Sequence, residues 1–324
     1  MATIEVKKLS KIYKRSKKGE GLKGLVKNIF FREYEEIEAL KEISFIVEEG
    51  EFVGYIGPNG AGKTTTLKIL AGILYPSGGE VKVNNYIPWE RKKEFLKSIT
   101  FVMGQKNQLW WDLPALDSFI LLKKIYEISD KEFKKNLDFF SSLLNVSHLL
   151  NVPVRKLSLG ERMKMELIAA LIHSPKIIFL DEPTIGLDIL SQEKIRTFLK
   201  EYNREFKTTI ILTSHYIKDI EDLCERVILI HRGEKIFDEK ASTLINKFVK
   251  DNLLYLFFKE NIPSDLHQFG TILSYNEKEV YLKIPREETG QVIHKLLEKY
   301  KLIEFRIERV TLEDVVKEIF RKLD

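Results

Sequence analysis

The chain has 324 residues, and its 44% hydrophobic and 31% charged content excludes a disordered or collagen-like protein. Its single cysteine, Cys224, excludes an internal disulfide, and its net charge of +5 permits nucleic acid or anionic lipid as a partner without requiring either. The N-terminus lacks the apolar region of a signal peptide, and the most apolar stretch, residues 167–180, is shorter than the roughly 18 residues of a membrane span. We therefore expect a soluble intracellular chain that depends on a partner for any membrane part.

The first 245 residues alternate between strand-like and helix-like patterns. A glycine-rich turn leads into an apolar helix after residue 62, and helical periodicity covers residues 112–150. The predicted strands are residues 3–8, 37–46, 51–56, 177–180, 209–212 and 227–230. Strands that alternate with helices predict an α/β fold with a mostly parallel sheet covered on both faces.

The pattern changes after about residue 245. The predicted strands there are residues 253–258, 271–274, 280–284 and 303–310, and the predicted helices are residues 289–300 and 311–323. Thr311 and Asp314 have the spacing of an N-terminal helix cap. We expect two domains, a large one over residues 1–245 and a small α+β domain over residues 246–324.

The basic residues are concentrated near the N-terminus. Residues 7–32 hold eight lysines, two arginines and one glutamate, which is a net charge of +9. Within them, residues 22–30 place apolar side chains at the spacing of one helix face, with lysines off that face. Such a helix either lies on an anionic membrane or a partner's surface, or packs on its own domain with a solvated basic face.

The strongest motif is a glycine-rich loop between a buried strand and a helix. It fits the P-loop pattern, in which backbone N–H groups and the positive end of the helix surround phosphate oxygens. The lysine adds a charge beside the β- and γ-phosphates, and the first threonine is a ligand for Mg²⁺. The candidate ATP-binding residues are Gly57, Pro58, Asn59, Gly60, Ala61, Gly62, Lys63, Thr64 and Thr65.

Two carboxylates end a second apolar strand. Asp181 and Glu182 directly follow residues 177–180, so they are expected at the carboxyl edge of the sheet, where α/β folds bind ligands. Asp181 is the candidate Mg²⁺ ligand with Thr64. Glu182 is the candidate that polarises an attacking water.

The stretch Leu157–Arg162, with the sequence Leu-Ser-Leu-Gly-Glu-Arg, lies between these two motifs. With them, it resembles the signature of the nucleotide-binding subunit of ATP-binding cassette (ABC) transporters. The resemblance implies a cassette with an antiparallel β subdomain and a helical subdomain at about residues 106–165. It also implies that two chains close on ATP head to tail, because the P-loop and the signature of one chain serve different ATP sites.

Other residues match the family's motifs in order along the chain. The resemblance assigns Gln105 to Mg²⁺ binding and to sensing the membrane partner, His215 to catalysis with Glu182 and Lys63, and Tyr13 to stacking on adenine. The signature and the following loop contribute Ser158, Gly160, Glu161 and Asp188 to the nucleotide site. Leu159 stands where the family usually has glycine, and Glu161 where it usually has glutamine.

The same resemblance predicts an Mg²⁺-dependent ATPase that drives transport, with export favoured. Residues 106–114, which contain Trp110 and Trp111, and residues 306–320 resemble daunorubicin-resistance and polysaccharide-export ATPases. The two tryptophans either dock a membrane domain or pack in the core. The expected partners are a transmembrane permease and a second copy of the chain, with no nucleic acid, at the cytoplasmic face of the membrane. The alternatives are an importer subunit with a regulatory C-terminal domain, and a non-transport ABC ATPase that acts on nucleic acid or ribosomes.

Overall fold

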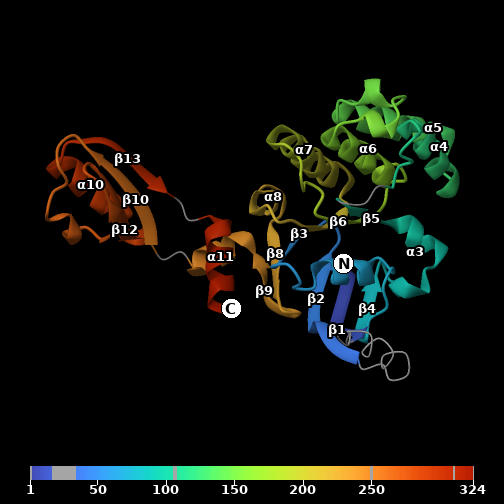
Figure 1. Ribbon diagram of the computed structural model, residues 1–324, viewed down its shortest axis with the longest axis horizontal. Helices are drawn as coiled ribbons and strands as arrows, with labels where there is room; N and C mark the ends of the chain where they lie inside the picture. The colour runs from blue at the N-terminus through green and yellow to red at the C-terminus, as the bar shows by residue number, and fades with distance from the viewer. Residues whose placement is uncertain (1, 17–33, 105–107, 249–250, 309–310, 324) are drawn as a thin grey trace, which may run out of the picture. The chain divides into compact units, whose positions relative to one another are not determined.

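The computed structural model describes residues 2–16, 34–104, 108–248, 251–308 and 311–323. They form two compact units, Met1–Asp238 and Glu239–Asp324 (Figure 1). The predicted helix over residues 22–30 lies outside the described residues. None of the described helices is both long and apolar enough to cross a bilayer.

The first unit is built on a six-stranded sheet with the order β5-β6-β7-β3-β8-β9. Its strands are β3 (Phe52–Ile56), β5 (Ile99–Met103), β6 (Ile177–Asp181), β7 (Thr209–Thr213), β8 (Arg226–His231) and β9 (Glu234–Lys240). The first five run parallel, and every residue of β3, β6 and β7 is buried. Burial on both faces explains why these strands are continuous apolar runs in the sequence.

A three-stranded antiparallel sheet lies in the same unit, with the order β2-β1-β4. It contains β1 (Ala2–Ser16), β2 (Tyr34–Glu48) and β4 (Gly78–Val83). Buried apolar residues of this sheet share one core cluster with β3 and with the helix that follows the glycine-rich loop. β1 continues well beyond the predicted strand over residues 3–8, because pairing with β2 and β4 overrides its basic composition.

Helices complete the first unit. They are α2 (Lys63–Leu70), α3 (Lys93–Ser98), α4 (Ala115–Ile125), α5 (Asp130–Leu143), α6 (Leu159–Leu171), α7 (Ile189–Phe206) and α8 (Ile217–Leu223). Single-turn 3₁₀ helices lie at Pro88–Glu90, Ser147–Leu149 and Val154–Lys156. The parallel sheet, the antiparallel sheet and these helices confirm the predicted cassette fold.

The second unit contains a four-stranded antiparallel sheet with the order β11-β12-β10-β13. Its elements are α9 (Ala241–Phe248), β10 (Asp251–Phe258), β11 (Thr271–Tyr275), β12 (Glu279–Pro285), α10 (Thr289–Lys299), β13 (Leu302–Glu308) and α11 (Leu312–Leu323), with 3₁₀ turns at Leu266–Gln268 and Arg286–Glu288. Alternate residues of β10 and β12 share a core with Val292 and Leu296 of α10. The predicted cap of α11 is confirmed, because the Thr311 hydroxyl accepts the backbone N–H of Asp314, and the Asp314 carboxylate accepts the Thr311 backbone N–H.

Candidate nucleotide site

The glycine-rich loop connects β3 to α2 and has a shape that side chains would disturb. A Cβ atom added to Gly57 would lie 2.4 Å from the carbonyl oxygen of Ile230, and one added to Gly62 would lie 2.6 Å from that of Ala39. Gly60 and Gly62 both have positive φ angles, which L side chains rarely adopt. Pro58, Asn59 and Gly60 form the exposed tip of the loop, and Ala61, Gly62 and Lys63 are buried below it.

Lys63, the first residue of α2, points back into this loop. Its ammonium group donates to the carbonyl oxygens of Gly57, at 2.6 Å, and Pro58, at 3.2 Å, and the residue is only 6% exposed. Burial lowers the pKa of Lys63, while the negative charges of Glu182 and Asp181 oppose that shift. A cation held beneath a turn of backbone N–H groups fits a phosphate chain, because the phosphate oxygens would replace the loop carbonyls as its partners.

Asp181 ends β6 and receives hydroxyl groups from two neighbouring elements. Thr64 of α2 donates to one carboxylate oxygen at 2.8 Å, and Thr213 at the end of β7 donates to the other at 2.7 Å. The carboxylate and the Thr64 hydroxyl therefore meet at the carboxyl edge of the sheet. This pair suits Mg²⁺, which takes one or two protein oxygens and completes its shell with water and substrate phosphates.

Glu182 lies next to this pair and is only half satisfied. One carboxylate oxygen, Oε1, lies 2.8 Å from Nε2 of His215, and the other, Oε2, is buried without a hydrogen-bond partner. Glu182 also has a positive φ of 58°, a strained conformation that often marks functional sites. Desolvation raises the pKa of Glu182, an effect opposed by His215 and Lys63. A carboxylate with a free oxygen and a raised pKa is suited to accept a proton.

A buried network that the sequence did not reveal holds the two loops carrying Glu182 and His215. Asp219 of α8 accepts from the hydroxyls of Thr184 and Ser214 and from the guanidinium of Arg196. Asp219 is fully buried. Thr184 lies two residues after Glu182, and Ser214 lies directly before His215. The network therefore links the loop after β6 and the loop after β7 to the Asp219 carboxylate. Its members are far apart in the sequence, and only the fold brings them together.

The predicted signature residues form a second cluster at the start of α6. Ser158 caps the helix by accepting the backbone N–H of Glu161, and the Glu161 carboxylate accepts the backbone N–H and the hydroxyl of Ser158. These hydrogen bonds lower the pKa of Glu161. Helix capping is thus a complete structural account of Ser158 and Glu161 within one chain.

Asp188 lies beside this cluster. It caps α7, accepting the backbone N–H and the hydroxyl of Ser191. A Cβ added to Gly160 would lie 2.4 Å from that same hydroxyl, so a glycine allows the two helix starts to approach closely. Within the described residues, the hydrogen bonds of Ser158, Glu161 and Asp188 stay at the starts of their own helices, α6 and α7, and do not reach the P-loop.

Tyr13 and Gln105 are the remaining predicted residues of the nucleotide site. Tyr13 of β1 is partly exposed, and its hydroxyl lies 3.4 Å from that of Thr65 at the start of α2. Lys11 lies over its ring, 5.3 Å from the centroid. Tyr13 therefore borders the P-loop with a partly exposed side chain. Gln105 lies outside the described residues.

Comparison with known proteins places this site in a family. Residues 40–185 match the family model "ABC transporter", and residues 253–308 match "EvrA-like ABC transporter, C-terminal domain". The chain is 34% identical to the ABC transporter ATP-binding protein NatA of Bacillus subtilis, over 69% of this chain and 91% of that protein. The chain belongs to the ABC transporter ATP-binding family. It is therefore the ATP-binding subunit of an ABC transporter, and an ATPase.

Two other relatives of this ABC ATPase carry more information in their names. The linearmycin resistance ATP-binding protein LnrL of Bacillus subtilis is 30% identical, over 67% of this chain and 69% of that protein. A solved dimer of the ATP-binding cassette MJ0796, described as a post-hydrolysis state bound to ADP and Pi, is 30% identical with a TM-score of 0.60 and covers 73% of this chain and 98% of that one.

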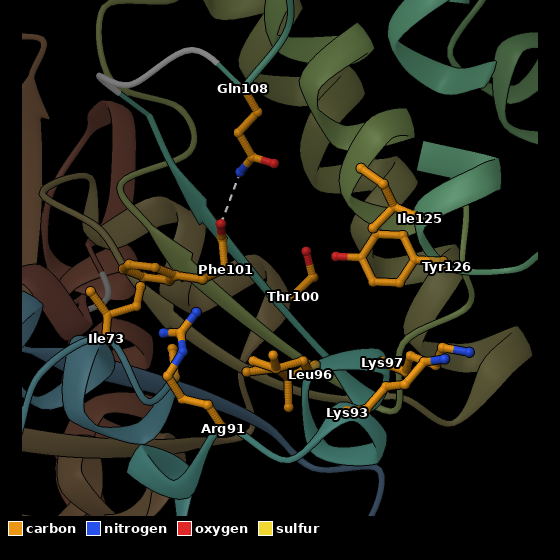
Figure 2. Close-up of a pocket in the computed structure, with 12 residues that line it drawn as sticks. Ile73, Arg91, Lys93, Leu96, Lys97, Thr100, Phe101, Gln108, Ile125 and Tyr126 are labelled. Carbon is orange, nitrogen blue, oxygen red and sulfur yellow. Dashed lines mark hydrogen bonds between the residues drawn. The ribbon is translucent and has the colours of Figure 1, made fainter. Parts of the chain in front are cut away.

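The ABC ATPase also has an open groove of about 540 Å³ between α3, β5 and the end of α4 (Figure 2). Arg91, Lys93 and Lys97 lie along one side of it, and Ile73, Leu96 and Ile125 supply apolar surface. Gln108, three residues after Gln105, closes the upper end and donates to the carbonyl of Phe101.

Trp110 and Trp111 are half exposed, so neither is a core residue. Trp111 lies 5.4 Å from the guanidinium of Arg162 on α6.

Proposed function

We propose that this subunit works as a pair of chains that close on two ATP molecules. Each ATP would lie between the P-loop of one chain and the cluster of Ser158, Gly160, Glu161 and Asp188 of the other. The separation of these two clusters within one chain supports the proposal. So do Ile189 and Leu190, which lie next to Asp188 and are 77% and 69% exposed, because such apolar side chains favour a covered surface.

Within one site, Gly57–Thr65 would surround the phosphates and Tyr13 would stack on adenine. Thr64 and Asp181 would hold Mg²⁺, with Gln105 as a further ligand. When bound, Mg²⁺ neutralises charge that develops on the phosphate oxygens. Lys63 would exchange its loop carbonyls for β- and γ-phosphate oxygens.

Glu182 is the proposed general base, and its unpartnered Oε2 is the observation that carries this assignment. It would accept a proton from water as the water oxygen bonds to the γ-phosphorus. The bond from that phosphorus to the β-phosphate oxygen would break in line, leaving ADP and phosphate. His215 would hold Oε1 of Glu182 and contact the transferred phosphate.

We further propose an exporter that works with a transmembrane permease on the cytoplasmic face of the membrane. Residues 1–245 would be the nucleotide-binding domain and residues 246–324 an accessory domain. The relative named for linearmycin resistance and the exposed Trp110 and Trp111 support this direction. The groove in Figure 2 suits a permease helix, because it combines apolar walls with cations and is lined at one end by Gln108.

The ATP-sandwich proposal is tested with Glu182→Gln, which keeps the shape of the site and removes the base. At a protein concentration low enough for the nucleotide-free chain to be monomeric, the variant should accumulate as a dimer with ATP and Mg²⁺ in analytical ultracentrifugation, while ADP should leave it monomeric. No ATP-dependent dimer would contradict the proposal.

The permease proposal is tested by co-purification with a polytopic protein encoded nearby. Ile125→Glu introduces a charge into the groove, and Ile120→Glu changes an exposed residue of the same helix that does not line it. Only the first variant should lose the permease, and the ATPase activity of both isolated subunits should stay unchanged. Equal co-purification of both variants would exclude this groove as the docking site.

A further inference from the structure

β13 forms one edge of the sheet in the second unit. It pairs antiparallel with β10 on one side and with no described strand on the other (Figure 1). An edge strand exposes backbone N–H and C=O groups that can pair with another strand. Natural proteins usually protect such an edge with charges, proline or a covering element, so the side chains of β13 are informative.

The apolar side chains of β13 are not covered. Ile303, Phe305 and Ile307 alternate along the strand and are 58%, 41% and 43% exposed. Their register with β10 places Phe305 opposite Leu256 and Ile307 opposite Leu254, on the face of the sheet that carries the core. The apolar layer of the core therefore continues to the open edge and ends there in Phe305 and Ile307. Ile303 lies at an irregularity in the pairing of β13 with β10, between Leu302 and Glu304.

The opposite face of β13 carries charges. The Arg306 guanidinium donates to the Glu304 carboxylate at 2.7 Å and lies 4.9 Å from the ring centroid of Tyr255 on β10. These two residues lie one on each side of Phe305 in the sequence. Phe305 therefore lies on the apolar face of the strand, and its two sequence neighbours form the charged face.

We propose that β13 pairs antiparallel with β13 of a second copy of the chain, about a two-fold axis at Phe305. This register places Glu304 opposite Arg306 of the partner subunit, twice by symmetry, and sets Phe305 and Ile307 of both strands on one continuous face. The sheets of the two copies would then form one continuous antiparallel sheet.

Other registers are much less favourable. A shift by one residue places the charged face of one strand beside the apolar face of the other. A shift that centres the axis on Glu304 or Arg306 sets like charges directly opposite each other, and parallel pairing in register does the same. Among the registers that pair all of residues 303–307, the order Ile-Glu-Phe-Arg-Ile is thus complementary to itself in one antiparallel register, which favours a second copy over an unrelated strand.

The proposed interface does not depend on nucleotide, so it is distinct from the ATP-sandwich contact. It would keep two subunits of the transporter together while the ATP sites are open. Tethering of this kind raises the local concentration of one cassette near the other, so closure on ATP becomes an event within one assembly.

Charge variants in the nucleotide-free full chain test the proposal. Glu304→Arg and Arg306→Glu each set like charges opposite each other and should weaken the dimer at least about tenfold in sedimentation equilibrium. Mixing the two single variants pairs a doubly positive strand with a doubly negative one, so dimers should return as heterodimers. Restoration on mixing separates pairing between chains from the Arg306–Glu304 contact within one chain, which mixing cannot restore.

A cross-link gives an independent readout. Residues opposite each other on the two-fold axis have Cα atoms about 4.5–5.5 Å apart, within reach of a disulfide. Phe305→Cys should therefore form a covalent dimer under mild oxidation, and Tyr275→Cys on the opposite edge strand β11 should not. The natural Cys224 does not interfere, because it is buried with a raised pKa.

Three results would overturn the proposal. These are a monomeric wild-type chain at about 100 µM, a dimer that both charge variants leave unchanged, and single variants that do not form heterodimers on mixing. The last result combined with two weakened homodimers would show that the charges act only within each chain.

Discussion

The P-loop cluster and the signature cluster share one chain but differ in how their polar groups are satisfied. Around the P-loop, Lys63 is buried against loop carbonyls and Oε2 of Glu182 has no partner. At the signature, Ser158 and Glu161 satisfy each other as a helix cap at the surface. The first cluster has unmet bonding capacity that a nucleotide can use, whereas the second is complete as local structure. One chain therefore carries a site ready for phosphate and a surface whose role depends on a second chain.

Glu182→Gln should produce the largest effect of the variants at these two clusters, and the quantity it lowers is ATP turnover. It removes the proposed base but keeps a side chain of the same size, so turnover of ATP should fall about 10²- to 10⁴-fold while ATP binding is retained. Phosphate release at saturating ATP measures the first quantity, and equilibrium binding the second. Glu225→Gln, an exposed change off the site, is the control, and a similar loss in that variant would argue against a specific role for Glu182.

Lys63→Ala tests whether the P-loop lysine binds the phosphates of ATP. Loss of a buried cation that faces phosphate should weaken ATP binding on the order of 10²-fold, since charged hydrogen bonds contribute about 1.5–3 kcal/mol each. Isothermal titration with ATP and Mg²⁺ measures the change. Lys68→Ala, in the last turn of the same helix, should bind ATP like the wild type, and unchanged binding in Lys63→Ala would contradict this role.

Ser158→Ala tests the second cluster, with a smaller effect. Loss of the cap should lower the free energy of unfolding by about 1 kcal/mol. If Ser158 also contacts the partner's ATP, the ATP-dependent dimer of a Glu182→Gln chain should weaken about tenfold, while ATP affinity of the monomer stays the same. Ser158→Asn keeps a capping side chain and should restore stability. Full dimerisation in Ser158→Ala would restrict the serine to capping.

The last prediction concerns stability alone and leaves nucleotide binding untouched, because it lies where the signature helix meets the sheet. His173 follows α6, and its ring stacks on the ring of Tyr126, which follows α4, with 3.8 Å between the ring centroids. Its Nε2 lies 3.2 Å from the carbonyl oxygen of Ile99 on β5. Burial lowers the pKa of His173 to about 4, against about 6.5 in an unfolded chain. Between these pH values the unfolded chain binds a proton that the folded chain does not. The free energy of unfolding should therefore fall as pH decreases from 6.5 to 4, by at most about 3 kcal/mol.

Denaturant unfolding at several pH values checks this dependence. His173→Gln cannot take up the proton and retains an amide that can bond to the Ile99 carbonyl, so its stability should depend less on pH. His294→Gln, an exposed histidine of α10, should behave like the wild type. Equal pH dependence in His173→Gln and the wild type would contradict the assignment.

Much of the cassette was readable from local sequence. The buried strands β3, β6 and β7 are continuous apolar runs, and the glycines of the P-loop follow from a backbone path that excludes Cβ atoms. The strands β4, β5 and β9 were not predicted, because they lack a continuous apolar run. β4 and β9 carry charged, largely exposed residues, and Thr100 interrupts β5. Domain limits were expected at residues 245 and 246, and the structure divides the chain after Asp238.

The sequence by itself determined the family motifs, since phosphate binding and proton transfer need particular residues at short, fixed spacings. It also determined the strand Ile-Glu-Phe-Arg-Ile, whose alternation is a local property. Only the tertiary structure decided that Asp219 joins the loops of Glu182 and His215, that Oε2 of Glu182 has no partner, and that the strand lies at an open edge. The physical reason is that such contacts join residues far apart in the chain, and only packing and sheet order bring them together.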